Sequence, residues 1–96
     1  MVTVDTEAIR TLAARFETAS IGLEQQASTL RAEANLSPNA FGRLPAGQQT
    51  FAEYDERLQR AVAGLRQVEA CLRQFAGNLR TVAANWERAD EDSRAG

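Results

Sequence analysis

An apolar residue recurs at alternating steps of three and four along the second half of the chain. This spacing keeps one face of an α-helix apolar over several heptads, as in a coiled coil, whereas a half-buried strand alternates at every second residue. The pattern therefore predicts one long helix with a continuous apolar seam. The seam positions are Phe51, Tyr54, Leu58, Ala61, Leu65, Val68, Leu72, Phe75, Leu79, Val82, Trp86 and Ala89.

A shorter helix is predicted in the first half of the chain, over about residues 6–34. Asp5 or Thr6 can cap its N-terminus, and Glu7 suits its first turn. Its apolar positions need one extra step of four near residue 23, which predicts a local unwinding of the supercoil. These positions are Ile9, Leu12, Phe16, Ala19, Leu23, Ala27, Leu30 and Ala34.

Breaker residues between the two segments predict a connection over about residues 35–47. Both prolines of the chain and two of its glycines lie there, namely Pro38, Gly42, Pro45 and Gly47. The second helix then covers about residues 48–90, and a short flexible tail follows over 91–96. The start of this helix is ambiguous. Pro45 suits a first helical position, while Thr50 and Glu53 have the spacing of a capping box.

The chain is therefore expected to be a single all-α domain, a two-helix antiparallel hairpin that resembles a coiled coil. Folding at the connection pairs Ile9 with Phe75, so that Leu79, Val82 and Trp86 project past the first helix. Leaving these three side chains in water forgoes about 1.5–3 kcal/mol each. We therefore expect dimerisation to complete a four-helix bundle. The expected partner interface consists of Leu72, Phe75, Leu79, Val82 and Trp86.

Composition argues against several classes of function. The chain has no histidine and one cysteine, so we expect no catalysis, no metal site and no cofactor. The net charge is −2 and no basic run occurs, so no nucleic-acid partner is expected. The longest apolar run, residues 61–65, is flanked by arginines, and we expect no membrane-spanning helix. The first ten residues do not have the pattern of a secretory signal peptide.

The single cysteine, Cys71, has no partner for an intrachain disulfide. Its simplest interpretation is a small apolar residue beside the helix seam. The alternative is an intermolecular disulfide across a dimer.

Two short segments are not explained by the helical pattern. Phe41 and Gly42 lie between the two prolines, which suggests a tight turn whose aromatic ring caps the hairpin end; partner docking is the alternative. Trp86 and Asp90 are one helical turn apart and share a face. They are either a seam tryptophan followed by a surface aspartate, or an aromatic and a carboxylate displayed together for recognition.

The order of these features resembles the EspC-like family of substrates of actinobacterial type VII (ESX) secretion, which is related to the WXG-type helical-hairpin secreted proteins. The resemblance implies a secretion signal of the form aromatic-x-x-x-Asp/Glu, with Trp86 where tyrosine is usual and Asp90 as the acid. The Trp-x-Gly turn of the wider superfamily is absent, since Trp86 is the only tryptophan. The matching segments are Val4-Asp5, Ala40-Phe41-Gly42 and Asn85-Trp86-Glu87-Arg88-Ala89-Asp90.

The resemblance implies a non-enzymatic substrate or accessory partner of a type VII system, exported from the cytoplasm as a folded helical dimer without a signal peptide. Its expected partners are a second copy or a different helical hairpin, and the secretion ATPase or apparatus. The alternative is a cytosolic coiled-coil scaffold or adaptor that is not exported. The two readings differ on whether Trp86 and Asp90 matter independently of stability.

Overall fold

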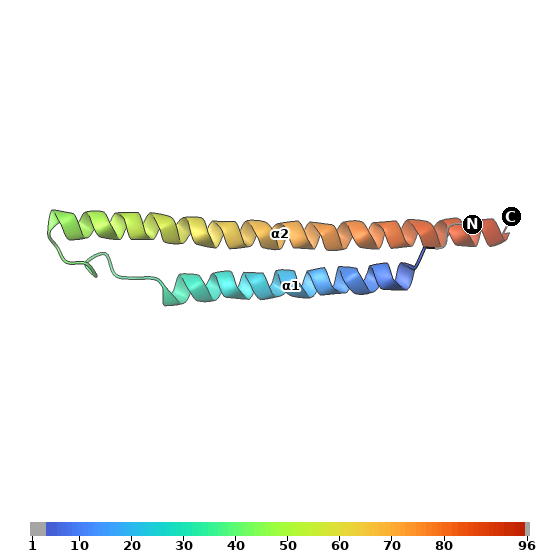
Figure 1. Ribbon diagram of the computed structural model, residues 1–96, viewed down its shortest axis with the longest axis horizontal. Helices are drawn as coiled ribbons and strands as arrows, with labels where there is room; N and C mark the ends of the chain where they lie inside the picture. Colours follow the sequence, from blue (N-terminus) through green and yellow to red (C-terminus); the bar gives the residue numbers. More distant parts are fainter. Residues whose placement is uncertain (1–3, 96) are drawn as a thin grey trace. The chain divides into compact units, whose positions relative to one another are not determined.

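The computed structural model describes residues 4–95 and contains two helices, α1 (Thr6–Glu33) and α2 (Pro45–Ala95), joined by a connection over 34–44 (Figure 1). No strand occurs within residues 4–95. The two helices are antiparallel. Arg10 of α1 pairs with Glu87 of α2, and Glu17, which comes later in α1, pairs with Arg80, which comes earlier in α2. The prediction of an all-α helical hairpin is therefore confirmed.

The start of α1 agrees with its predicted cap. The Asp5 Oδ1 atom accepts a hydrogen bond from the backbone N–H of Ala8 at 2.9 Å. This bond satisfies one of the N–H groups that have no partner inside the helix.

The helix α2 is longer at both ends than the sequence predicted. It begins at Pro45, the first-turn position that tolerates proline, and Thr50 instead donates a side-chain hydrogen bond to the Ala46 carbonyl inside the helix. The capping-box interpretation is therefore wrong. At the other end the helix continues through Ala95, where a flexible tail was expected from residue 91. No breaker residue occurs in 91–95, and an ion pair between Asp90 and Arg94 supports this turn.

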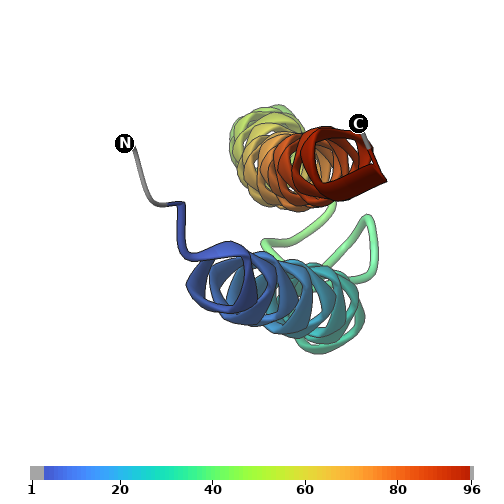
Figure 2. The same ribbon diagram turned by 90° about the vertical axis from the view of Figure 1, so that its right-hand side faces the viewer.

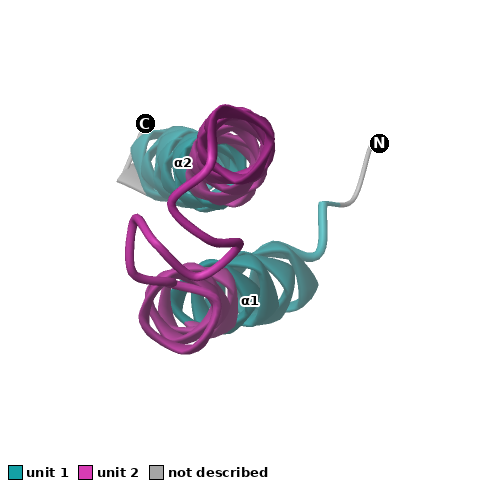
Figure 3. Ribbon diagram, turned by 90° about the vertical axis from the view of Figure 1, so that its left-hand side faces the viewer, with its two compact units in different colours: residues 1–21, 69–96 teal, residues 22–68 magenta. Residues whose placement is uncertain are grey.

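The chain divides into two compact units, coloured separately in Figure 3. Unit 1 contains the chain up to Ile21 together with the chain from Glu69 onward, and unit 2 contains residues 22–68. Each unit thus pairs part of α1 with part of α2. Figure 2 views unit 1 from its end, where the start of α1 lies beside the last part of α2.

The inner face of α1 follows a register that differs from the predicted one. Ala13 and Ser20 are buried, whereas the predicted seam residues Leu12 and Ala19 are exposed. With this change the 3-4 spacing continues without the extra step of four that was expected near residue 23. The buried and half-buried positions of this spacing are Ile9, Ala13, Phe16, Ser20, Leu23, Ala27, Leu30 and Ala34.

The inner face of α2 shows the same kind of difference. Its seam is Leu58, Val62, Leu65, Glu69, Leu72, Ala76, Leu79 and Ala83, all buried or half-buried. The predicted seam positions Ala61, Val68, Phe75 and Val82 are exposed. Two of its most buried positions are alanines, Ala76 and Ala83, and such small side chains let two helix backbones approach closely. Within unit 1, Phe75 still contacts α1 at its edge, with its ring stacked on Phe16 at 6.0 Å between centroids.

The inner face of α2 in unit 1 includes the carboxylate of Glu69. Its side chain is only 8% exposed, while the Arg73 side chain that forms its ion pair is exposed. Ser20 is the other buried polar side chain of unit 1, and its hydroxyl donates to the Glu17 carbonyl. The inner face of unit 1 is therefore not purely apolar.

In unit 2 the connection runs back along the first turns of α2 (Figure 1). The Phe41 ring meets the Tyr54 ring edge to face at 6.0 Å, and the Tyr54 hydroxyl donates to the Ala34 carbonyl. The end of α1 is thereby fixed opposite Tyr54 rather than at the first turn of α2.

The predicted pairing of the helices is wrong within unit 1. The sequence paired Ile9 with Phe75, but Phe16 contacts Phe75 and Arg10 contacts Glu87. The helix α1 therefore reaches the turn of α2 that contains Trp86. The expectation that Leu79, Val82 and Trp86 project past α1 is wrong.

Candidate recognition site

Trp86 and Asp90 are exposed in the last part of α2. The Trp86 side chain retains 44% of its accessible surface, although the sequence placed it in the seam. The Asp90 Oδ2 atom lies 3.0 Å from Nη2 of Arg94, and both side chains are mostly exposed. The two residues are one turn apart in a helix that is continuous through both. They present an indole and a carboxylate on one accessible face.

The residue next to Trp86 joins α2 to α1. Glu87 accepts two hydrogen bonds from Arg10, at 3.0 Å from Nε to Oε1 and at 2.8 Å from Nη2 to Oε2. These hydrogen bonds hold the pKa of Glu87 below its usual value and raise the pKa of Arg10. The bidentate pair fixes the turn that contains Trp86 against the second turn of α1.

A second ion pair lies two turns away. Arg80 of α2 pairs with Glu17 of α1. Arg80 is seven residues before Glu87, and Glu17 is seven residues after Arg10. Along each helix the two charges have opposite signs, arginine then glutamate. Both ion pairs can therefore form together only in this antiparallel register. The apolar spacing does not reveal these two ion pairs, although opposite charges at intervals of seven residues were a usable signal.

The five predicted interface residues fall into two groups. Leu72 and Leu79 lie half-buried on the inner face of α2. Phe75, Val82 and Trp86 are large apolar side chains with 52%, 43% and 44% of their surface exposed. In the same unit, Leu12 of α1 is also 44% exposed. The available apolar surface is therefore on the side of the hairpin and comes from both helices.

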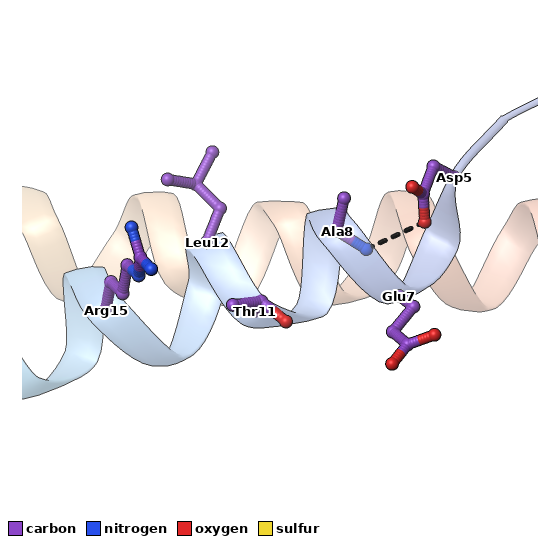
Figure 4. A pocket seen from close by; sticks show the side chains of 6 residues that line it. All are labelled: Asp5, Glu7, Ala8, Thr11, Leu12 and Arg15. Atoms are coloured by element: carbon purple, nitrogen blue, oxygen red, sulfur yellow. Dashed lines mark hydrogen bonds between the residues drawn. The ribbon is translucent and has the colours of Figure 1, made fainter.

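A shallow hollow lies at the start of α1 (Figure 4). Leu12 and Ala8 point to the same side of the helix, while Glu7 points away from them. The residues that line the hollow are Asp5, Glu7, Ala8, Thr11, Leu12 and Arg15. A second hollow, on α2, is lined by Cys71, Gln74, Phe75 and Asn78. Cys71 is exposed, with a free thiol.

The predicted turn residues Phe41 and Gly42 lie at the end of the connection. Gly42 has a φ of 95°, which favours glycine, and its N–H donates to the Asn39 carbonyl at 2.9 Å. Gly47, which the sequence marked only as a breaker residue, packs directly against this turn. A Cβ there would overlap the Phe41 carbonyl oxygen. The first turn of α2 can therefore approach Phe41 only with glycine at this position.

Two kinds of feature are absent from the part of the chain that the structure describes. No group of three or more His, Cys, Asp or Glu side chains within residues 4–95 is arranged to hold a metal ion. Neither α1 nor α2, over the part of the chain that the structure describes, is long and apolar enough to cross a membrane.

These features define a protein that consists of a helical hairpin with an exposed aromatic-x-x-x-acid motif near the end of its second helix. The sequence model of one family, described as "Excreted virulence factor EspC, type VII ESX diderm", matches residues 1–95. The chain belongs to this EspC family of type VII ESX secreted proteins. No curated protein and no solved structure matches the sequence.

Proposed function

We propose that the chain is a non-enzymatic substrate or accessory partner of a type VII (ESX) secretion system. In this proposal it folds in the cytoplasm and is exported by the type VII route as a folded helical dimer. Its partners are a second helical hairpin and the secretion ATPase or apparatus. Membership of a secreted family supports the general role.

The proposed secretion signal is the pair Trp86 and Asp90. The observation that carries this assignment is their common exposure one turn apart on α2, with no tertiary partner for Asp90 among the described residues. An indole that retains nearly half of its surface and a carboxylate on the same face can be bound together by one receptor groove. The pair between Arg10 and Glu87 supports the assignment, because it holds the intervening turn in place.

The proposed dimer rests on the exposed apolar side chains of unit 1. The exposed surface of Leu12, Phe75, Val82 and Trp86 favours association, because each large side chain moved out of water contributes about 1 kcal/mol or more. The proposal that the chain is not an enzyme rests on its composition. With no histidine and one cysteine, the usual pairs of nucleophile and base cannot be assembled.

The decisive experiment measures export of Asp90→Ala in a host with a working type VII system. Losing the exposed pair with Arg94 changes the stability by only about 0.3–0.5 kcal/mol. We therefore expect the variant to fold and to remain in the cell lysate, while the wild-type chain appears in the culture supernatant. Trp86→Tyr, which restores the aromatic usual in the family signal, is expected to be exported.

Two control variants separate recognition from a general loss of negative charge. Asp92→Ala removes a neighbouring exposed carboxylate that does not share the face of Trp86, and Arg94→Ala breaks the ion pair but leaves Asp90 in place. Both are expected in the supernatant. Undiminished export of Asp90→Ala would contradict the signal assignment. Retention of the wild-type chain would instead favour the cytosolic scaffold.

A further inference from the structure

The last turns of α2 lie beyond the buried inner face of unit 1. Ala83 is the last buried residue of α2, and every side chain from residue 85 to residue 94 is exposed. The proposed signal, Trp86 and Asp90, lies in these turns. Helix ends without buried contacts open locally much more easily than a core does. The signal therefore needs some other support if it is to keep its shape.

One side-chain interaction attaches these turns to α1, whose start lies beside them (Figure 2). Glu87 lies between Trp86 and Asp90 and accepts two hydrogen bonds from the Arg10 guanidinium, at 3.0 and 2.8 Å. Within residues 4–95, no other residue after Ala83 has a side-chain hydrogen bond or ion pair to α1. A bidentate pair of arginine and carboxylate fixes both the distance and the orientation of its partners. The pair thus holds the turn that contains the signal.

The signal depends on the helix at this point. Trp86 and Asp90 share a face only while the helix continues through both residues. The segment 85–95 is shorter than the ~12–15 residues that an isolated helix needs in water, so it does not hold this shape by itself. If the turn opens, the indole and the carboxylate no longer point to the same side.

We propose that the ion pair between Arg10 and Glu87 makes the secretion signal readable only while α1 is docked on α2 in unit 1. The inference rests on the proposed function, because it assigns a regulation to the signal of Trp86 and Asp90. Arg10 is a positioning residue, which acts through Glu87 without touching the receptor. A chain whose α1 is not docked displays no complete signal, so the pair checks the folding of unit 1 before export.

The second ion pair of unit 1 provides a matched control. Arg80 and Glu17 join the same two helices, with side chains that are 43% and 46% exposed. The corresponding values for Arg10 and Glu87 are 45% and 44%. The control pair lies before the buried residue Ala83, so the inner face still anchors its turn. Breaking either pair should therefore change the stability alike, while only one of them attaches the signal.

The first test measures amide hydrogen exchange in the last turns of α2. Arg10→Glu places two carboxylates opposite each other, and Arg80→Glu does the same at the control pair. We expect Arg10→Glu to speed exchange in residues 86–94 by roughly threefold or more, because repulsion replaces an attachment. Arg80→Glu should leave this exchange unchanged. Acrylamide quenching of Trp86, the only tryptophan, provides a second readout of the same turn. Equal exchange in the two variants would overturn the inference.

The second test measures export in a host with a working type VII system. We expect Arg10→Glu and Glu87→Arg each to lower the fraction of chain in the supernatant by roughly threefold or more. Arg80→Glu should be exported like the wild type. The double variant of Arg10→Glu with Glu87→Arg rebuilds the pair with its charges exchanged and should restore export. Circular dichroism melts compare the stability of all four variants.

The double variant separates positioning from direct contact with the receptor. Recovery of both the slow exchange and the export supports a positioning role for Arg10. Recovery of slow exchange without export would overturn it, because the receptor would then contact Arg10 or Glu87 itself. If Arg10→Glu does not fold, Arg10→Gln removes the charge without repulsion and is compared with Arg80→Gln in the same way.

The outcomes also distinguish the inference from the proposed signal. Wild-type export of Arg10→Glu, with Asp90→Ala retained in the lysate, would overturn the inference and leave the signal assignment standing. Undiminished export of Asp90→Ala would contradict the signal itself. Equal loss of export in Arg10→Glu and Arg80→Glu would overturn the inference as well, because export would then follow the stability of unit 1 rather than this one pair.

Discussion

Arg10 and Glu87 are 77 residues apart in the sequence and are joined by two hydrogen bonds between their side chains. The pair connects the second turn of α1 to the residue that follows Trp86. It therefore fixes the start of the hairpin beside the proposed secretion signal. Both side chains are nearly half exposed, so the interaction is accessible to salt and to pH.

The first prediction concerns the pH dependence of this pair. Because the pKa of folded Glu87 lies below its unfolded value, the pair contributes stability above the unfolded pKa and loses it as the pH falls through the folded pKa. We therefore expect Glu87→Gln to lower the Tm slightly near neutral pH and low salt. In acid, where the wild-type carboxylate is protonated, the two Tm values should converge. Thermal melts of both proteins across this range check it, and a difference that persists in acid would contradict the assignment.

The second prediction concerns the buried carboxylate of Glu69. Replacing a nearly buried charge with an apolar side chain of similar size removes a desolvation penalty and is often stabilising. We expect Glu69→Leu to raise the free energy of unfolding by about 1 kcal/mol or more. Glu53→Leu, at an exposed position of the same helix, serves as the control and should change it little. Chemical denaturation of the three proteins measures the difference. A destabilised Glu69→Leu chain would show that the carboxylate makes a favourable contact.

The sequence predicted the two helices and their hairpin arrangement because the apolar spacing and the breaker residues agree. It did not predict the inner face of α2, since two overlapping stripes share Leu58, Leu65, Leu72 and Leu79. Between these leucines, one stripe adds Val68, Phe75 and Val82, and the other adds smaller or charged residues. Hydrophobicity favours the first stripe. Close approach of the backbones favours the second, as the burial of Ala76 and Ala83 shows.

The pairing of the helices required information that the apolar spacing does not contain. Within unit 1, the stacking of Phe16 on Phe75 places α1 about one heptad further along α2 than the apolar spacing predicted. The correct register is specified by alternating charges on the two helices, Arg10 and Glu17 on α1 and Arg80 and Glu87 on α2. These charges predict the register only once the inner face of each helix is known. For the candidate signal, helical spacing placed Trp86 and Asp90 on one face. Only the family resemblance gave that face a role.

The third prediction tests whether the chain is a single domain, as the sequence suggested. The borders between the two compact units fall inside α1 and α2 rather than in the connection. Because helix formation is cooperative along a continuous segment, we propose that the chain unfolds in one transition. Far-ultraviolet circular dichroism follows the whole helix content, and Trp86 fluorescence reports on unit 1. Transitions with clearly separate midpoints would contradict a single domain.

The fourth prediction concerns the close approach of α2 to the turn at Phe41. In Gly47→Ala the added methyl group overlaps the Phe41 carbonyl oxygen and lies 2.9 Å from its carbon. The connection must then shift away from Tyr54, and we expect a loss of about 1–3 kcal/mol in the free energy of unfolding. The hydrogen bond from Tyr54 to the Ala34 carbonyl, in the same unit, should weaken as well.

A matched variant distinguishes this steric effect from a general effect of replacing glycine in α2. Gly77 also lies in α2, and a Cβ there has no atom within 4 Å. Gly77→Ala should therefore stabilise the chain by up to about 1 kcal/mol, through helix propensity alone. Urea denaturation of the wild type and both variants measures whether each substitution raises or lowers the free energy of unfolding. If Gly47→Ala is as stable as Gly77→Ala, the turn at Phe41 does not constrain α2.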